Sequence, residues 1–542
     1  MPDILLIQPP VRDFYLTAKR TIPYGLACIA STLGESGFSV DIFDALATSK
    51  SRITDLPPEM AYLREYYPEP DISPFGLFCH FRHFGYSFEH IGKIARDTGA
   101  FLVGISSLFT AYSGEALEAA RTVRKFHPKC RIVLGGHHPT AMPGKVMECE
   151  AVDFVIRGEG EVSMPLLARE IRNSKSEIRN SKLAEIPGIV FRRDEGGLHV
   201  GKPAVMADLN AYPLPALHLV KHGFYKRGNQ GSAVIMASRG CPMKCSYCSV
   251  GASGLKYRRR SVDSVMREIE EAVTRYKAGF IDFEDENLSL DRKWFTELLN
   301  EIIRRFGESG LELRAMNGLF PPSLDQSMIK LMKNAGFRTL NLSLGSTSGK
   351  QLRRFRRPDV RHAVEKVICS AEKYGLGVVC YIIAAAPGQK PGDSLSDLLC
   401  LARRKALAGV SVFYPSPGSP DFELCENLKI LPEHLSLMRS AALPVAHTTT
   451  RLEAVTILRL GRMLNFMKSL DEIPKSSRFA ENRIRDIRDR KEIGIQLLQS
   501  FLDDGKIRGM TPEGAVFECA ISEKLAEKFR TEVSETGCRN RI

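Results

Sequence analysis

The stretch Ser238-Arg239-Gly240-Cys241-Pro242-Met243-Lys244-Cys245-Ser246-Tyr247-Cys248 directly follows a short apolar run at 233–237. The apolar run predicts a buried strand, and the polar stretch after it predicts a loop. Cys241, Cys245 and Cys248 stand in that loop at the spacing C-x3-C-x2-C. Three thiolates so close in sequence can bind three corners of one metal cluster. A strand followed by such a loop indicates a barrel that carries its chemistry at the carboxyl ends of its strands.

The sequence after this stretch repeats the alternation of strand and helix. Strand-like runs are expected at 233–237, 280–283, 313–316, 339–344, 378–384 and 409–414, with helices near 261–276, 292–306, 324–335, 360–374 and 393–407. A closed TIM barrel needs eight such units, and this region has six. The pattern therefore predicts a partial (βα)6 TIM-like barrel over residues 231–430.

The sequence before it predicts a separate α/β unit over residues 1–185. Strand-like runs at 4–8, 40–44, 102–106, 131–135 and 154–157 alternate with helical stretches at 24–36, 113–126 and 161–172. This alternation favours a doubly wound, flavodoxin-like parallel sheet, which binds ligands at the carboxyl ends of its strands. Small residues at those ends mark a candidate ligand edge: Ser106, Ser107, Gly135, Gly136, Gly158 and Glu159.

Three further segments complete the chain. Residues 47–95 are rich in Pro and aromatic residues and predict an insertion without an assigned role. Residues 186–230 predict a hairpin and a connector, and residues 431–542 predict a helical C-terminal region. The sequence EIRNSK occurs at both 170–175 and 177–182, which predicts a lengthened polar surface segment.

Composition excludes several classes of protein. The chain has 542 residues, of which 44% are hydrophobic and 26% charged, and its apolar runs are too short for a membrane span. The N-terminus lacks the basic and apolar regions of a signal peptide, which predicts a cytoplasmic protein. Thirteen cysteines, an odd and scattered set, favour free thiols with one metal or catalytic group over a disulfide framework.

The positive charge is concentrated in two loops that follow predicted barrel strands. The net charge is 76 − 63, or +13. One loop carries Lys256 and Arg258 to Arg260, and the other spans 350–361. An anionic substrate or cofactor phosphate explains them as well as solvated helix starts do. Nucleic acid is not supported, because no aromatic platform accompanies the charges. The basic run at 483–491 is interpreted as the solvated face of an amphipathic helix.

The cysteine group admits several interpretations by itself. A [4Fe–4S] cluster held by three cysteines keeps one iron open for a ligand. A structural zinc ion requires a fourth ligand, and no fourth cysteine stands beside the group. Zinc binding in a non-catalytic protein, or three buried structural cysteines, are the alternatives.

The cysteine motif, with Tyr247 before its last cysteine, resembles that of the radical S-adenosylmethionine superfamily. The similarity extends through 238–242, 257–261, 283–287, 317–318, 344–346 and 387–389. It implies a [4Fe–4S] cluster on Cys241, Cys245 and Cys248, whose open iron binds S-adenosylmethionine. One electron, from a donor such as flavodoxin or ferredoxin, then gives methionine and a 5′-deoxyadenosyl radical.

The same resemblance implies roles for other residues. Asp285, Glu286 and Asn287 correspond to the contact with the methionine amino group, and Tyr247 corresponds to a shield of the cluster from water. Ser343 and Ser346 correspond to a ribose or carboxylate contact, and Gly388 to the turn near the adenine. The sequence at 344–348 is Leu-Gly-Ser-Thr-Ser, where relatives carry Gly-x-Glu-Ser-Gly, so the ribose contact departs from the family pattern.

The N-terminal half resembles the cobalamin-binding domain that precedes the barrel in one branch of this superfamily. The similarity rests on 4–10, 104–106, 135–140 and 158–161. The D-x-H-x-x-G motif that supplies an axial histidine elsewhere is absent from the sequence. The branch implies a small-molecule substrate and methylation of an unreactive carbon. A ring-forming or rearranging reaction without methyl transfer, with or without cobalamin, is the alternative.

Overall fold

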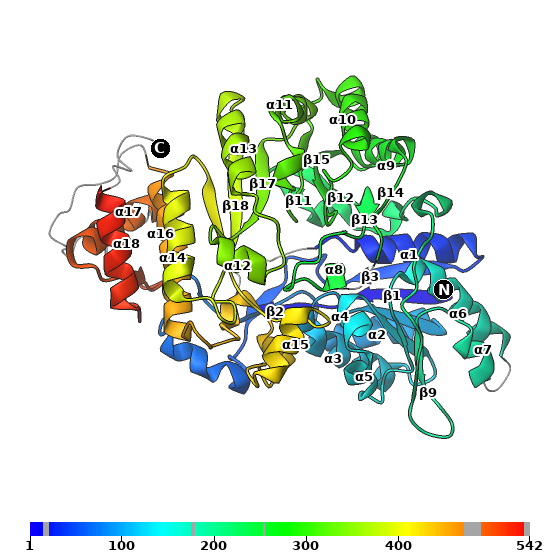
Figure 1. Ribbon diagram of the computed structural model, residues 1–542. Coiled ribbons are helices and arrows are strands. Elements are labelled where there is room, and N and C mark those ends of the chain that lie inside the picture. The colour runs from blue at the N-terminus through cyan, green and yellow to red at the C-terminus, as the bar shows by residue number, and fades with distance from the viewer. Residues whose placement is uncertain (15–20, 175–178, 253–254, 471–488, 536–542) are drawn as a thin grey trace.

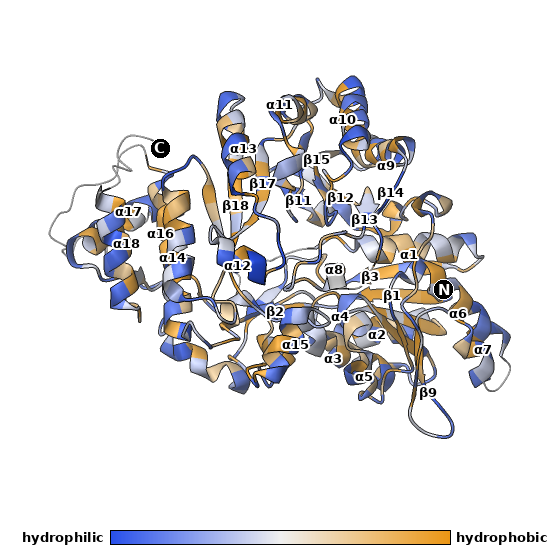
Figure 2. Cartoon of the chain, in the orientation of Figure 1, coloured by the Kyte–Doolittle hydropathy of each residue, from blue (hydrophilic) through white to orange (hydrophobic). Residues whose placement is uncertain are grey.

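The computed structural model describes residues 1–14, 21–174, 179–252, 255–470 and 489–535. Two α/β parts lie against each other, and a mainly helical C-terminal part packs beside the second of them (Figure 1). Apolar residues are concentrated in the central strands, whereas the outer helices carry the polar residues (Figure 2). Among the described residues, no helix combines the length and apolar character that crossing a bilayer requires.

The N-terminal part is a doubly wound sheet, as predicted. Its strand order is β10-β9-β8-β7-β6-β1-β3. The parallel strands are β1 (Ile4–Gln8), β3 (Val40–Asp44), β6 (Leu102–Ser106), β7 (Arg131–Gly135) and β8 (Phe154–Ile156). Helices α2 (Phe88–Thr98) and α3 (Ser113–Phe126) cover one face, and α1 (Tyr24–Glu35) and α6 (Gly160–Asn173) cover the other. Both faces of these strands are buried, which explains their nearly continuous apolar sequences.

The hairpin expected in the connector belongs to this sheet. Strand β9 (Ile189–Arg192) pairs antiparallel with β8, and β10 (Leu198–Val200) pairs with β9. The sheet therefore continues beyond residue 185, because β9 pairs with the backbone N–H and C=O groups on the open edge of β8.

The barrel strands form two sheets that curve toward each other. One has the order β11-β12-β15-β16 and the other β17-β18-β19. The strands are β11 (Lys226–Arg227), β12 (Gln230–Ile235), β15 (Ala278–Phe283), β16 (Glu312–Arg314), β17 (Thr339–Gly345), β18 (Gly377–Ala384) and β19 (Leu407–Val412). Single bridges from Leu313 to Phe337 and from Leu319 to Leu342 connect the sheets.

Five helices between the six parallel strands cover their outer side and confirm the partial barrel. They are α9 (Val262–Thr274), α10 (Arg292–Phe306), α11 (Gln326–Ala335), α13 (Arg361–Lys373) and α14 (Pro391–Ala402). One apolar core joins these helices, the strands and the C-terminal helices. Packing this core fixes the carboxyl ends of the strands, where ligands bind in such barrels.

The C-terminal part contains α16 (Arg451–Met467), α17 (Arg490–Asp504) and α18 (Glu523–Glu535), with a hairpin of β20 (Arg508–Met510) and β21 (Val516–Glu518). It packs on the 47–95 insertion. Arg459 of α16 donates to the backbone oxygen of Tyr66, and Ile72 donates its backbone N–H to Met510. The insertion thus joins the N-terminal and C-terminal parts. Most of the basic run at 483–491 lies outside the described residues, as does the junction of the EIRNSK duplication.

Candidate active site

The cysteine loop begins and ends in a two-stranded ribbon. Strand β13 (Ser238–Arg239) pairs antiparallel with β14 (Arg258–Arg259), so that the segment between them closes into a loop. Gly240 has φ +85°, and a Cβ there would lie 2.6 Å from the carbonyl oxygen of Lys256. Glycine is required at this position, because the left-handed conformation and the close backbone leave no room for a side chain. The ribbon therefore fixes where the loop starts.

The loop supplies hydrogen-bond donors to its own cysteines. The backbone N–H of Met243 and the side chain of Asn287, a residue outside the loop, face Cys241. The backbone N–H groups of Val250 and Gly251 face Cys248. Burial raises the pKa of Cys241 and Cys248, and the neighbouring thiols add to the increase. N–H donors of this kind stabilise the thiolate ligands of iron–sulfur clusters and tune their reduction potential.

The three cysteines differ in burial within one loop. In the part of the chain that the structure describes, no three His, Cys, Asp or Glu side chains lie close enough together to share one metal ion. Cys245 is buried, and Cys241 and Cys248 are half-buried in the same loop. Three thiols in one loop at this spacing can bind three corners of a [4Fe–4S] cluster.

Arg357 extends toward the cluster loop from the basic segment at 350–361. Its Nη1 lies 3.7 Å from Cys245 Sγ and 3.1 Å from Tyr247 Oη, and its Nη2 donates to the backbone oxygen of Ser343. The Tyr247 ring packs edge-on against Phe355, with centroids 5.0 Å apart. One guanidinium therefore links Cys245 and Tyr247 of the cysteine loop to Ser343 of β17, a role that sequence spacing did not reveal.

The acidic turn after β15 binds the strand and ribbon that precede the cysteines. Asp285 is 2% exposed and accepts hydrogen bonds from the backbone N–H of Ala237 and the hydroxyl of Ser238. Burial raises its pKa to about 7. Glu286 accepts the N–H of Gly240 at 3.1 Å. With Asn287 facing Cys241, these three residues lie at the base of the loop and not on a solvated turn.

The two other predicted barrel residues occupy different surroundings. Ser346 is fully buried and donates to Asp397 Oδ2 at 2.8 Å, which turns its hydroxyl into the fold. Gly388 has φ +79° and donates its N–H to His447 Nδ1 at 3.2 Å. Gly388 thus forms a turn as predicted, whereas Ser346 holds the start of the segment after β17.

The predicted edge of the N-terminal sheet is formed by close-packed backbone. Ser106 ends β6, and the buried Ser107 hydroxyl has no partner among the described residues. Gly135 ends β7, and a Cβ on Gly136 would lie 2.5 Å from the Ser107 oxygen. Gly158, at φ +83°, is equally close to Ala204. This edge offers backbone and a free hydroxyl to a ligand.

Two histidines follow Gly136. His138 is buried, its Nδ1 lies 3.3 Å from Thr110 Oγ1, and burial lowers its pKa to about 4. His137, next to it, is exposed. The turn after β8 binds the ribbon that closes the cysteine loop, through the ion pairs Glu159–Arg258 and Glu161–Arg239, so this end of the sheet lies beside the cysteine end of the barrel.

Glu159, at the same edge, has its partners in the barrel. Its carboxylate accepts two hydrogen bonds from Arg258, at 2.8 and 3.0 Å, across the boundary between the two α/β parts. Burial by itself would raise the pKa of Glu159, but these hydrogen bonds hold it below its usual value.

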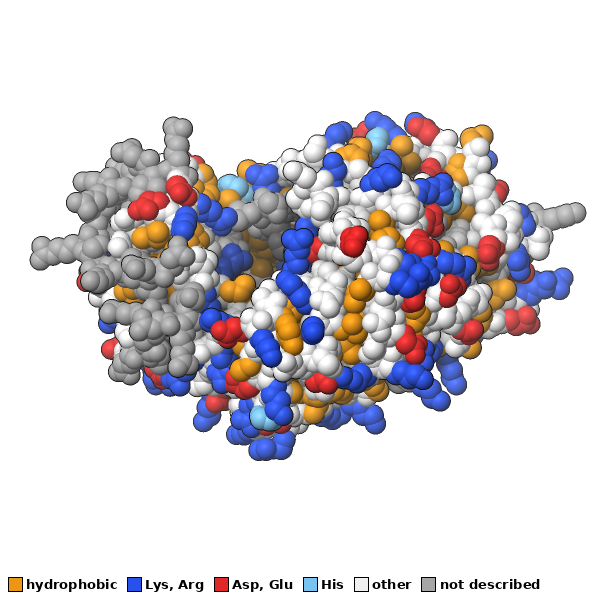
Figure 3. Space-filling model, turned by 90° about the horizontal axis from the view of Figure 1, so that it is seen from above, with side chains coloured by type: hydrophobic (Ala, Val, Ile, Leu, Met, Phe, Trp, Pro, Cys, Tyr) orange, Lys and Arg blue, Asp and Glu red, His pale blue; other side chains and the backbone are white. Residues whose placement is uncertain are grey.

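Most of the arginines in the two basic loops have acidic partners. The pairs are Arg258–Glu159, Arg259–Asp291, Arg260–Glu268, Arg354–Asp421 and Arg361–Asp359. On the face drawn in Figure 3, Lys and Arg side chains are interspersed with Asp and Glu. The positive charge therefore serves the fold to a large extent, which leaves less of it for an anionic ligand.

Sequence reasoning missed a set of exposed apolar side chains that follow strand ends. They are Leu108 and Phe109 after β6, Met316 after β16 and Tyr414 after β19, between 38% and 51% exposed. Large apolar groups at such ends suit a ligand with an apolar surface. Their position just past each predicted strand is the signal that could have identified them.

Two family models match the chain in this order. The B12 binding domain matches residues 17–168, and the Radical SAM superfamily model matches residues 235–398, which include the three cysteines. The chain thus carries a B12 binding domain followed by a radical S-adenosylmethionine domain.

Two curated methyltransferases and a solved structure resemble most of the chain. An uncharacterized methyltransferase of Pyrococcus horikoshii is 25% identical over 78% of this chain and 84% of its own. Cytidylyl-2-hydroxyethylphosphonate methyltransferase of Streptomyces wedmorensis is 25% identical over 76% and 79%. The radical S-adenosylmethionine methyltransferase TsrM of Kitasatospora setae, solved with cobalamin and a [4Fe–4S] cluster, shares the fold with a TM-score of 0.61, at 20% identity over 80% and 79%.

Proposed function

We propose that this chain is a cobalamin-dependent radical S-adenosylmethionine methyltransferase that methylates an unreactive carbon of a small molecule. The observation that carries the proposal is the proximity of two sites. The cysteine loop of the barrel lies beside the glycine-rich edge of the B12-binding domain, since Glu159 and Glu161 after β8 bind Arg258 and Arg239 of the ribbon that closes the loop. When bound, the cluster and cobalamin supply one-electron reduction of S-adenosylmethionine and a transferable methyl group.

The chain's own residues bind and orient these groups. Cys241, Cys245 and Cys248 are the proposed cluster ligands, with the loop N–H groups and Asn287 stabilising their thiolates. Arg357 and Tyr247 cover Cys245 and exclude water from it. These contacts keep the loop in one conformation before any ligand binds, which limits the reorganisation that binding requires.

The remaining site residues are assigned by their surroundings. We propose that Glu286 and Asn287 contact the amino group of S-adenosylmethionine, with Asp285 holding the strand before the loop. Ser343 and Gly388 border the same end of the barrel. Ser106, Ser107, Gly135 and Gly136 form the cobalamin edge, and the exposed apolar residues after β6, β16 and β19 form the ligand surface.

The electron donor is proposed to be an acidic protein such as flavodoxin or ferredoxin. Lys244 lies inside the cysteine loop, and Lys350, Arg353 and Arg356 lie on or after α12 (Gly349–Arg354). All four are exposed, and within the described ranges none has an ion-pair partner. The loop and α12 are in contact, since Ser246 donates its N–H to the backbone oxygen of Phe355.

A cytoplasmic location fits the state of the cysteines. All twelve cysteines in the described part of the chain are free thiols. Free thiols in such number are typical of a reducing compartment.

The test is anaerobic reconstitution of the full chain with iron, sulfide and hydroxocobalamin. We expect about one cobalamin and four irons per chain, 5′-deoxyadenosine on reduction, and transfer of labelled methyl from S-adenosylmethionine to cobalamin. The Cys245→Ala variant should lose deoxyadenosine formation and keep its fold. Deoxyadenosine without any methyl transfer to cobalamin would contradict methylation and favour a ring-forming reaction, and one zinc per chain would contradict the enzyme.

A further inference from the structure

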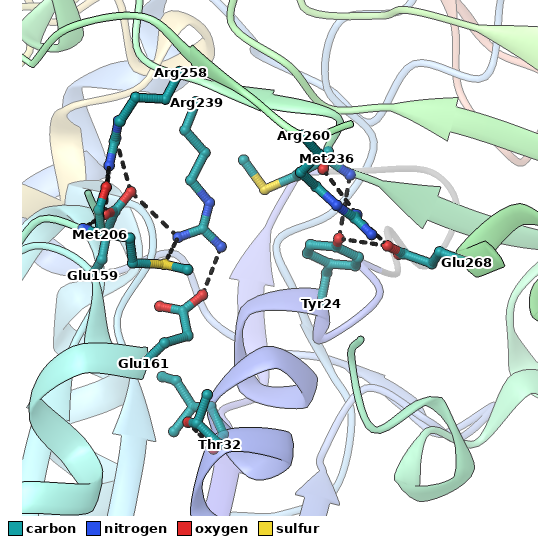
Figure 4. A network of polar contacts seen from close by, with 11 residues as sticks. Tyr24, Thr32, Glu159, Glu161, Met206, Met236, Arg239, Arg258, Arg260 and Glu268 are labelled. Carbon is teal, nitrogen blue, oxygen red and sulfur yellow. Dashed lines mark hydrogen bonds and ion pairs between the residues drawn. The ribbon is translucent and has the colours of Figure 1, made fainter. Parts of the chain in front are cut away.

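The turn at 158–161 ends β8 and begins α6, and its two carboxylates point out of the N-terminal part toward the barrel (Figure 4). Glu159 accepts hydrogen bonds from both terminal nitrogens of Arg258, at 2.8 and 3.0 Å, and lies 3.3 Å from Arg239 Nη1. Glu161 Oε1 lies 2.6 Å from Arg239 Nη2. The four side chains are between 7% and 17% exposed, so water screens these pairs little.

The two arginines belong to opposite strands of the ribbon that closes the cysteine loop. Arg239 stands on β13 and Arg258 on β14, and these two residues are direct cross-strand partners. Glu159 binds both of them, so one carboxylate of the N-terminal part connects the two strands at the base of the loop. Arg239 is two residues before Cys241. Movement of the Arg239–Arg258 pair therefore moves Cys241, the first proposed cluster ligand.

The connector takes part in the same network. The backbone N–H of Met206 donates to Glu159, and the Met206 oxygen accepts from Arg258 Nη1 at 2.5 Å. Arg239 Nη1 also lies 3.3 Å from Met206 Sδ. Loss of the Glu159 carboxylate leaves Arg258 without its acidic partner, and loss of the Glu161 carboxylate leaves Arg239 only its longer contact with Glu159. Unpairing a largely buried charge in this way destabilises the network.

We propose that Glu159 and Glu161 are positioning residues for the iron–sulfur cluster, which hold the cysteine loop of the barrel from the cobalamin-binding domain. The two domains thus build the cluster site together, and the 158–161 turn serves the cluster and not the corrin. This inference rests on the assignment of the three cysteines as cluster ligands. It does not depend on methyl transfer.

The experiment compares Glu159→Gln and Glu161→Gln with the wild-type chain after anaerobic reconstitution. Asp153→Asn is the matched control, because Asp153 also binds two arginines, Arg124 and Arg131, at 2.5 and 3.2 Å, but within the N-terminal part. The readouts are the rate of iron release to a chelator, the electron paramagnetic resonance spectrum of the reduced cluster, and the cobalamin retained per chain.

We expect both glutamate variants to release iron at least about tenfold faster than wild type, with a shifted spectrum and unchanged cobalamin. The tenfold figure corresponds to about 1.4 kcal/mol, within the cost of unpairing a buried charge. The Asp153→Asn control should match wild type in all three readouts. Iron release and spectra equal to those of the control would overturn the proposal, and so would loss of cobalamin with normal iron retention.

A second variant covers the case in which a glutamine variant does not fold. Arg258→Lys keeps the charge but cannot donate two parallel hydrogen bonds to Glu159. It should fold and release iron at a rate between wild type and Glu159→Gln, and a wild-type rate would overturn the proposal. If the wild-type chain itself acquires no iron, the cluster assignment fails; if it holds a cluster without methyl transfer, only the proposed function fails.

Discussion

Gly136 offers a quantitative test of the cobalamin edge. Its backbone has φ 120° and ψ −174°, a region that is essentially restricted to glycine. A Cβ at this position would lie 2.5 Å from the carbonyl oxygen of Ser107 and 2.9 Å from its carbonyl carbon. Both are backbone atoms at the end of β6, so they cannot rotate away as a flexible side chain could.

The expected cost of Gly136→Ala follows from these two effects. The conformation alone costs about 1–3 kcal/mol for a residue with a side chain. The clash adds to this cost, because relieving it requires the backbone at Ser107 to move. We therefore expect Gly136→Ala to lower the free energy of unfolding by about 3 kcal/mol or more. If the strain is relieved by displacing the edge, the same energy corresponds to about 100-fold weaker cobalamin binding.

The assay is titration with hydroxocobalamin followed by absorbance, together with urea unfolding of the apoprotein. Gly144→Ala is the control, because Gly144 lies in the nearby helix α5 (Pro143–Met147) and a Cβ there meets nothing within 4 Å. This control should bind cobalamin normally and gain about 0.5–1 kcal/mol of stability. Cobalamin affinity and unfolding midpoint of Gly136→Ala equal to those of the control would refute the reasoning.

Three further outcomes are expected. Burial lowers the pKa of His138 to about 4, so the unfolded chain takes up a proton more easily than the folded chain, and the free energy of unfolding falls as pH decreases from about 6.5 to 4. His138→Gln should remove ~3 kcal/mol of this pH dependence, measured by urea unfolding at pH 7.5 and 4.5. An unchanged pH dependence would contradict this prediction. Arg357→Gln removes a positive charge beside Cys245 and should lower the reduction potential of the cluster in a spectroelectrochemical titration, whereas the exposed Arg356→Gln should not. Arg459→Met leaves the backbone oxygens of Tyr66 and Ala520 without their donor. It should destabilise the chain by about 2–5 kcal/mol in thermal unfolding and leave the iron content unchanged. Wild-type stability would show that the contact between the insertion and α16 is not needed.

The alternation of elements could be predicted because each element carries its own pattern. The runs at 4–8, 40–44, 102–106 and 131–135 coincide with β1, β3, β6 and β7. Parallel strands covered on both faces need almost continuous apolar sequence, which is a local signal. The barrel strands were less sharply bounded: the run at 233–237 corresponds to β12 (Gln230–Ile235), because pairing with β11 and β15, and not hydrophobicity, decides where it begins.

The partners of charged residues could not be predicted from spacing. Glu159 was assigned to the cofactor edge because it follows a strand, yet it binds Arg258, 99 positions further along the chain. The basic residues near 256–260 suggested an anionic ligand, whereas Arg258, Arg259 and Arg260 each pair with a carboxylate of the fold. The energy of a buried ion pair depends on geometry and desolvation, and neither is encoded locally.

The sequence by itself determined the chemistry of this protein and its order of domains. Three cysteines at fixed spacing must share one loop, and apolar periodicity specifies strands and helices over short distances. The tertiary structure decided which residues surround that loop. Arg357 reaches Cys245 across 112 positions and Glu161 reaches Arg239 across 78, because the packing of distant elements sets these contacts. Long-range contacts of this kind exist only after the core has folded, so local sequence does not encode them.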